Sequence, residues 1–268
     1  MYSIQPDWTL SSDYYKKRVV NRLGIAHFYE FRINNLNAAS LPSVPDDCVD
    51  VVFDLGGESA IAAGTVFERG VTWMVTGHTY FGMRFLPGVK PVILHGNFRE
   101  YDHHQIDLGL CSIDRFIREK ICELHDFNER CNFFMYYYQS MLARKSPDTT
   151  TVQDTVRAIL SGISDRKGIV TIDEIVQKSG YSGRYIEKIF KNEMGLTPKK
   201  YANIMRFQGA LDFIDRNPDV NISDVATDFG YYDQSAFVRA FKKCTGLAPS
   251  DYRKLIKSAD YMSRIRNM

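Results

Sequence analysis

The sequence predicts an α+β fold, in which an N-terminal β-barrel of the jelly-roll type, with accompanying helices, precedes an all-α C-terminal domain. The C-terminal domain is predicted to hold two helix-turn-helix units joined by a long helix. Short β-rich segments separated by Gly, Pro, Asn or Asp occupy the first third of the chain. Apolar residues at helical spacing occupy the second half. Between residues 171 and 252 one pattern occurs twice, and such a repeat outweighs local propensity.

The two copies of this pattern match residue by residue. The first copy reads Thr171-Ile-Asp-Glu174, Gly180-Tyr181, Ile186, Ile189, Phe190 and Gly195-Leu-Thr-Pro198. The second copy reads Asn221-Ile-Ser-Asp224, Gly230-Tyr231, Phe237, Ala240, Phe241 and Gly246-Leu-Ala-Pro249. The offset is 50 residues up to the glycine and 51 after it, so the second copy has one residue inserted in its turn.

Residues that favour helix ends define a short helix, a turn and a second helix in each copy. Thr171 with Glu174 forms a capping box, and Asn221 begins a weaker version of it. Each copy's first glycine lies where the chain must turn, and glycine accepts the positive φ of such a turn. Ser182 and Asp233 are placed to cap the second helix. Both copies are therefore predicted to be helix-turn-helix units.

The faces opposite the apolar stripes are polar and basic. They carry Arg184, Glu187, Lys188 and Lys191 in the first copy, and Ser235, Val238, Arg239 and Lys242 in the second. On a single helix such a face is more often merely solvated. Here Lys188 matches Arg239, and Lys191 matches Lys242, at the same offset of 51. The repetition favours a shared binding function over simple solvation.

A long helix is predicted between the copies, from Pro198 to Asn217. Thr197 and Pro198 suit the N-cap and first helical positions. Twenty residues at about 1.5 Å each give a rod of roughly 30 Å. Successive major grooves on one face of DNA lie about 34 Å apart. One chain is thus able to present two helices to adjacent turns of DNA.

Residues 150–257 resemble the DNA-binding domain of the AraC/XylS family of transcriptional regulators. The match comprises the repeated residues above together with Ile172, Val176, Ser182, Lys191, Tyr201, Arg206, Ala210, Tyr252 and Arg253. The resemblance implies a double-stranded DNA partner, RNA polymerase as a further partner, and a homodimer. It implies base contacts by Arg184, Glu187, Lys188, Gln234, Ser235 and Arg239. We predict phosphate contacts by Ser182, Lys191, Lys199 and Lys242. Two residues depart from the expected pattern. Gly183 adds flexibility at the start of the second helix, and the Glu187 carboxylate is repelled by phosphates unless it accepts a hydrogen bond from a cytosine amino group.

The length of 268 residues suggests two domains, predicted at 1–145 and 146–268. Their charge differs, because the chain carries a net −2 through Pro147 and +4 from Asp148 onward. This bias agrees with DNA contact by the second domain. The five cysteines show no Cys-x-x-Cys pair, and no signal peptide or long apolar run is present. We therefore expect a reduced cytoplasmic protein without membrane association, in which the thiols are inert or, alternatively, sense redox state.

The N-terminal half begins with a segment, Met1 to Tyr15, that is predicted to be a mobile arm. Six strand-like segments follow, at 25–33, 49–55, 60–66, 71–76, 80–86 and 92–94. Their number and spacing suggest a small sandwich or barrel. Residues 44–56 and 81–88 resemble a cupin-like sensor domain of the kind often fused to AraC-type DNA-binding domains.

Cupin barrels include metal enzymes, so that alternative is tested against the histidines. A metal-binding cupin needs two histidines one residue apart on a strand, and none of the six histidines is so placed. His103 and His104 are adjacent, so on a strand they face opposite sides. No Ser/His/Asp, phosphate-loop or paired-carboxylate motif occurs. We expect no catalytic residues, no metal, no cofactor and no enzymatic activity.

A ligand pocket is predicted at Phe53, Trp73, Arg84 and Phe85. Trp73 is one of two tryptophans and lies mid-strand, whereas most of these aromatic residues suit a core equally well. Arg84 alternates with apolar residues, so its charge would be costly inside the barrel without a partner. That partner is an anionic ligand or, in the favoured interpretation, a structural carboxylate such as Asp50 or Asp54.

Two helical segments, 113–124 and 134–142, follow the barrel, and either dimerisation or packing on the barrel explains their apolar stripes. A polar linker is predicted at 143–151. The sequence therefore predicts a DNA-binding transcriptional regulator that responds to an unidentified small molecule. Two alternatives stay open: an N-terminal domain that only dimerises or binds a protein partner, and a cupin enzyme with a DNA-targeting domain.

Overall fold

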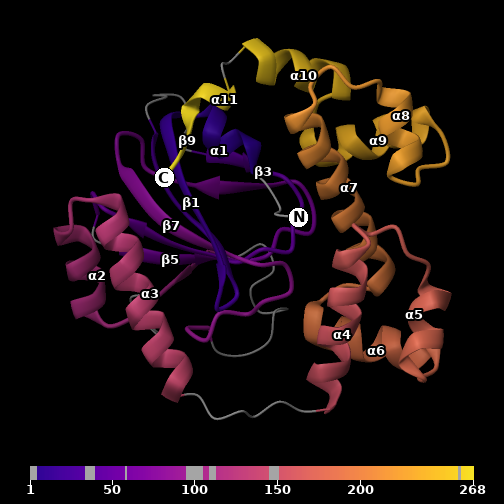
Figure 1. The fold of residues 1–268 in the computed structure, drawn as a ribbon, viewed down its shortest axis with the longest axis horizontal. Helices are drawn as coiled ribbons and strands as arrows, with labels where there is room; N and C mark the ends of the chain where they lie inside the picture. The colour runs from indigo at the N-terminus through magenta and orange to yellow at the C-terminus, as the bar shows by residue number, and fades with distance from the viewer. Residues whose placement is uncertain are drawn as a thin grey trace.

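A computed structural model describes residues 5–33, 40–57, 59–94, 105–108, 113–144, 151–258 and 261–268. The fold is mixed α+β, with a sheet-bearing N-terminal half and a helical C-terminal half (Figure 1). None of the helices in these described ranges combines the length and apolar character needed to cross a bilayer.

The strands are β1 (Ser12–Arg22), β2 (Ile25–Ile33), β3 (Ser40–Ser43), β4 (Asp50–Asp54), β5 (Ser59–Ala63), β6 (Gly70–Trp73), β7 (Thr79–Phe85), β8 (Gln105–Asp107) and β9 (Ile265–Asn267). The helices are α1 (Pro6–Leu10), α2 (Arg115–Glu123), α3 (Phe127–Arg144), α4 (Thr151–Asp165), α5 (Ile172–Ser179), α6 (Gly183–Met194), α7 (Pro198–Arg216), α8 (Ile222–Asp228), α9 (Gln234–Thr245), α10 (Pro249–Ser258) and α11 (Tyr261–Arg264).

One sheet has seven strands in the order β8-β5-β4-β7-β2-β1-β9, and a second pairs β3 with β6. All pairs are antiparallel except β1 with β9. Successive side chains of a strand point to opposite faces, and accordingly Phe28 and Phe53 belong to one apolar cluster whereas their neighbours Tyr29 and Val52 belong to another. The large sheet therefore has an apolar core on each side. The jelly-roll arrangement of these strands stays a prediction.

Helix α3 covers one face of the large sheet. Its Phe134 ring lies 6.2 Å from Phe28 and 6.0 Å from Phe53, measured between centroids. The buried guanidinium of Arg130 also donates to Glu30 on β2 at 2.6 Å. Packing on the sheet therefore accounts for the apolar stripe of α3, while dimerisation through α3 stays a prediction.

The expected N-terminal arm is wrong for residues 5–15. Pro6 and Trp8 are buried residues of α1, and β1 begins at Ser12. Trp8 packs edge-on against Tyr29 with ring centroids 5.9 Å apart, so apolar burial fixes this segment on the second face of the sheet. The segment 92–94 is a turn and not a strand. The predicted boundary at 145 and 146 lies outside the described residues.

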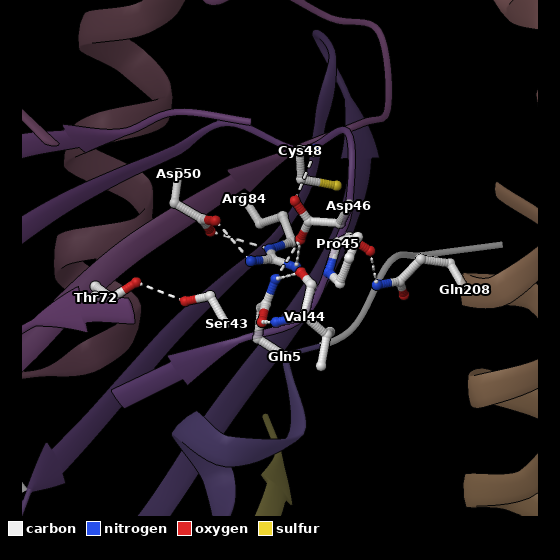
Figure 2. A network of polar contacts seen from close by, with 10 residues as sticks. All are labelled: Gln5, Ser43, Val44, Pro45, Asp46, Cys48, Asp50, Thr72, Arg84 and Gln208. Carbon is white, nitrogen blue, oxygen red and sulfur yellow. Dashed lines mark hydrogen bonds and ion pairs between the residues drawn. The ribbon is translucent and has the colours of Figure 1, made fainter. Parts of the chain in front are cut away.

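A cluster of buried charges holds the loop from Ser43 to Cys48 (Figure 2). Arg84 on β7 donates two hydrogen bonds to Asp50, at 3.0 and 2.6 Å, and one to Asp46 at 3.0 Å. The Gln5 amide donates to Asp46 at 2.7 Å and exchanges two hydrogen bonds of 2.8 Å with the backbone of Val44. Arg84 thus has structural carboxylate partners, including the Asp50 named from the sequence.

The same loop contacts the helical half through α7. Gln208, which is fully buried, donates to the backbone carbonyl of Pro45 at 2.7 Å (Figure 2). Val44 packs into the apolar cluster that contains Phe207 and Leu211. Asp47 belongs to the same loop, and its burial raises the pKa of the carboxyl group to about 8. The Tyr201 hydroxyl lowers this pKa, but by less than burial raises it. A carboxyl group that keeps its proton at neutral pH suits an apolar contact of this kind.

Candidate nucleic-acid interface

The first helix pair, α5 and α6, is built as the capping residues predict. The Thr171 hydroxyl accepts from the Glu174 amide at 3.2 Å, and the Ser182 hydroxyl accepts from the Tyr185 amide at 3.3 Å. Gly180 has a φ of 70°, the left-handed conformation expected of this turn. The Glu174 carboxylate pairs with Arg166 on the preceding segment, so only half of the capping box forms.

The second pair, α8 and α9, repeats this construction with small differences. Asn221 accepts from the Ser223 amide at 3.0 Å, and Asp233 accepts from the Ala236 amide at 2.6 Å. Gly230 has a φ of 65°. The inserted residue is Tyr232, which is 97% exposed and lies immediately before the cap of α9. The insertion therefore lengthens the turn without disturbing either helix.

In both pairs, apolar burial determines which face of the second helix stays exposed. On α6 the buried residues include Ile186, Ile189 and Phe190, and on α9 they include Phe237 and Phe241. The predicted contact residues are all exposed: Ser182, Arg184, Glu187, Lys188, Lys191, Lys199, Gln234, Ser235, Arg239 and Lys242. Within the described part of the chain, none of their charged side chains forms an ion pair. The exposed faces of α6 and α9 are therefore available to an anionic partner.

Helix α7 joins the two pairs and runs from Pro198 to Arg216, close to the predicted limits. Its 19 residues give a length of roughly 28 Å at about 1.5 Å per residue. The Thr197 hydroxyl accepts from the Lys200 amide at 3.2 Å, as expected of an N-cap. In Figure 1, α7 passes between the group α4–α6 and the group α8–α10.

The side chains that fix the second pair and α10 on α7 have no role that the sequence predicts. Arg206 donates to the Gly230 carbonyl at 3.0 Å, and its guanidinium lies 5.4 Å from the centre of the Tyr231 ring. The buried Tyr252 hydroxyl donates to Asp215 at 2.6 Å. Arg206 and Tyr252 both belong to the residues that carry the family resemblance. That resemblance singles them out but does not show which groups they contact.

The four residues of the predicted ligand pocket do not lie together. Phe53 and Phe85 are fully buried in the core beneath α3, and Arg84 is in the charge cluster. Trp73 is 66% exposed and lines a cavity of about 470 Å³ on the other side of β4. The cavity's other lining residues are Val52, Asp54, Ser59, Ile61, Met74, Val75, Thr76 and Tyr80. Among the described residues no group of three His, Cys, Asp or Glu side chains is placed to hold a metal ion.

Two capped helix pairs with exposed basic faces, joined by one long helix, define a class of helix-turn-helix DNA-binding proteins. A helix-turn-helix domain family matches residues 175–255. The chain is 32% identical over 103 residues to the probable transcription factor PqrA of Proteus vulgaris, covering 38% of this chain and 83% of that protein. The chain belongs to the AraC family of helix-turn-helix transcriptional regulators.

Two further comparisons involve more distant proteins. The uncharacterized regulator YtdP of Bacillus subtilis is 25% identical over 158 residues. These residues make up 57% of this chain and 20% of YtdP, so the chain spans about a fifth of that relative. The crystal structure of a probable AraC family transcriptional regulator from Rhodopseudomonas palustris has 24% identity and a TM-score of 0.35. The matched region makes up 38% of this chain and 95% of the chain in that crystal structure.

Proposed function

We propose that the chain regulates transcription by placing α6 and α9 in successive major grooves of double-stranded DNA. The observation that carries this proposal is the matched pair of exposed basic faces on two helices joined by α7. Arg184, Glu187, Lys188, Gln234, Ser235 and Arg239 would meet base edges, and Ser182, Lys191, Lys199 and Lys242 would meet phosphates. Ser182 is able to contact a phosphate although it caps α6. Its hydroxyl oxygen accepts a hydrogen bond from the Tyr185 amide, and its hydroxyl proton is left to donate to a phosphate.

The test of this proposal is the salt dependence of binding. Neutralised phosphates release counterions, so the logarithm of the affinity should fall linearly with the logarithm of salt, by about 0.9 per phosphate contact. Lys191→Ala and Lys242→Ala should each reduce that slope by about one and weaken all sequences alike. Lys120→Ala on α2, an exposed lysine of the sheet-bearing half, is the matched control and should change nothing. Affinity that does not vary with salt would contradict the proposal.

The partners follow from this function. We propose a cytoplasmic regulator that acts as a homodimer and contacts RNA polymerase at its promoter, with the domain boundary near 145. The relatives it matches are named as transcriptional regulators, and no observation favours the alternative of a cupin enzyme with a DNA-targeting domain. A sheet-bearing half that only dimerises or binds a protein remains the main alternative to a sensor.

We further propose that a small-molecule effector, as expected of a sensor domain, occupies the cavity beside Trp73. The walls are largely apolar and Asp54, Ser59 and Thr76 supply a few polar groups, as in ligand pockets generally. A ligand that binds only the folded state must raise the melting temperature. We expect at least one member of a metabolite panel to do so, and Trp73→Ala to abolish the shift. A shift that survives Trp73→Ala would place the ligand elsewhere, and no shift with any compound would favour dimerisation or partner binding.

A further inference from the structure

Helix α7 contains a weak point near its middle. Gly209 lies there, buried between Gln208 and Ala210. Glycine is the weakest helix former apart from proline, because it gains the most backbone freedom when the helix opens. The first helix pair packs on α7 through residues up to Met205, whereas the second pair contacts α7 on both sides of Gly209, at Arg206 and Phe207 and again at Ala210, Leu211 and Ile214. A bend at Gly209 would therefore distort the surface that holds the second pair and move its exposed basic face relative to that of the first pair.

The sheet-bearing half contacts α7 at this weak point. The Gln208 amide donates to the Pro45 carbonyl at 2.7 Å, one residue before Gly209. Val44 packs in the same cluster as Ala210 and Leu211, on the other side of the glycine. Hydrogen bonds from the buried side chains of Arg84 and Gln5 hold the loop in place (Figure 2). The loop, held by these hydrogen bonds, therefore supports α7 at the point where the helix bends most easily.

A second contact holds the far end of the helical half. Strand β9 pairs in parallel with β1, with Ile265 opposite Tyr15 and Asn267 opposite Lys17. Arg264 donates to the carbonyls of Leu10 and Ser12, at 2.6 and 3.2 Å. Because α10 and α11 connect the second helix pair to β9, this pairing ties that pair to the sheet.

We propose that the sheet-bearing half sets the spacing between the two DNA-reading helices, by seating the Ser43–Cys48 loop beside Gly209 and by pairing β9 with β1. Residues of the first pair, Ile186 and Phe190 among them, belong to the same apolar cluster as Phe28 and Phe85 of the sheet, so the sheet-bearing half holds both pairs. Any event that loosens the loop or the strand would change which DNA sites both helices read together. This inference rests on the proposed DNA-binding function, and it makes Gln208 a positioning residue that touches no DNA.

The experiment measures tolerance to spacing. Sites are selected from a random-sequence duplex library with the wild-type chain. One base pair is then inserted or removed between the two contacted segments, which shifts one segment by about 3.4 Å along the axis. Wild type should lose affinity steeply at either altered spacing. Gln208→Met keeps the side-chain length and removes the donor, and Arg266→Pro blocks strand pairing. Each should reduce the spacing penalty about fivefold or more, equivalent to about 1 kcal/mol.

Two matched controls separate positioning from general damage. Lys200→Met removes an exposed ion pair between α7 and Glu68, and Arg266→Ala changes the same exposed position without removing its N–H. Both control variants should lose as much affinity at altered spacing as the wild type does. If Gln208→Met and Arg266→Pro melt cooperatively and lose as much as the wild type, the inference is wrong. If only one of these two variants folds, its loss of affinity at altered spacing decides whether the inference holds. A wild-type chain that selects no two-part site would overturn the proposed function, and this inference with it.

Discussion

Replacing Arg84 by methionine is expected to reduce the free energy of unfolding by about 3–5 kcal/mol, the largest stability effect among the substitutions considered. Arg84 and its two carboxylate partners are each at most 3% exposed. Removing the guanidinium leaves Asp46 and Asp50 buried without their cation, so the desolvation of two carboxylates is no longer offset. The measurement is urea denaturation of both proteins at neutral pH, read as a shift of the midpoint.

The matched control for Arg84→Met is Arg115→Ala on α2. Arg115 pairs with Glu119 at 2.6 Å, but its side chain is 82% exposed, and such pairs contribute at most about 1 kcal/mol. Adding Asp46→Asn and Asp50→Asn to Arg84→Met should recover part of the loss, because the amides carry no charge. A midpoint for Arg84→Met equal to that of Arg115→Ala would show that the cluster contributes little net stability.

Arg239→Ala and Lys188→Ala are expected to weaken binding to a selected site by about 1–3 kcal/mol each, which is roughly 5- to 150-fold. A base-reading side chain makes hydrogen bonds that a wrong base cannot offer, so both variants should also relax the preference at particular base pairs. The relaxed positions for the two variants should lie about one helical turn apart, because α7 sets their separation. Competition binding against single-base variants of the site measures both quantities.

Arg239→Lys separates charge from recognition at the same position. It keeps the positive charge but loses the planar fork that allows bidentate contact, so specificity should fall more than total affinity. Lys120→Ala on α2 is the control for an unrelated surface lysine. A footprint confined to one turn of DNA per chain would show that one of the two helix pairs has only a structural role.

Much of the C-terminal half was predictable, because its structure depends on local chemistry. The caps at Thr171, Ser182 and Asp233 and the left-handed glycines are short-range effects, visible within four residues of sequence. The capping box at Asn221 formed differently, because the Asn221 side chain accepts from the Ser223 amide two residues on, a local bond that asparagine makes readily. The exposed contact faces follow from helical periodicity, which the repeat presents twice.

The N-terminal half was less predictable, because its contacts join residues far apart in the chain. The strand pattern predicts a carboxylate partner for Arg84, and of the two candidates Asp50 is confirmed, whereas Asp54 pairs with His78. The contacts that Asp46 makes with Arg84 and with Gln5 depend on how the loop folds back, which the sequence does not show. The strand pattern alone places Trp73 together with Phe53 and Phe85. The direction of each side chain depends on register and on which face α3 covers, and neither is encoded locally.

By itself the sequence determined two repeated helix pairs, the helix between them and the residues they expose, since turn chemistry and periodicity act within a few residues. Only the tertiary structure decided how the two halves are joined. The Gln208–Pro45 hydrogen bond spans 163 positions, and the Arg264–Leu10 hydrogen bond spans 254. Contacts at such separations form only when the packing of the whole chain offsets the entropy of closing the loop, and no local pattern records that balance.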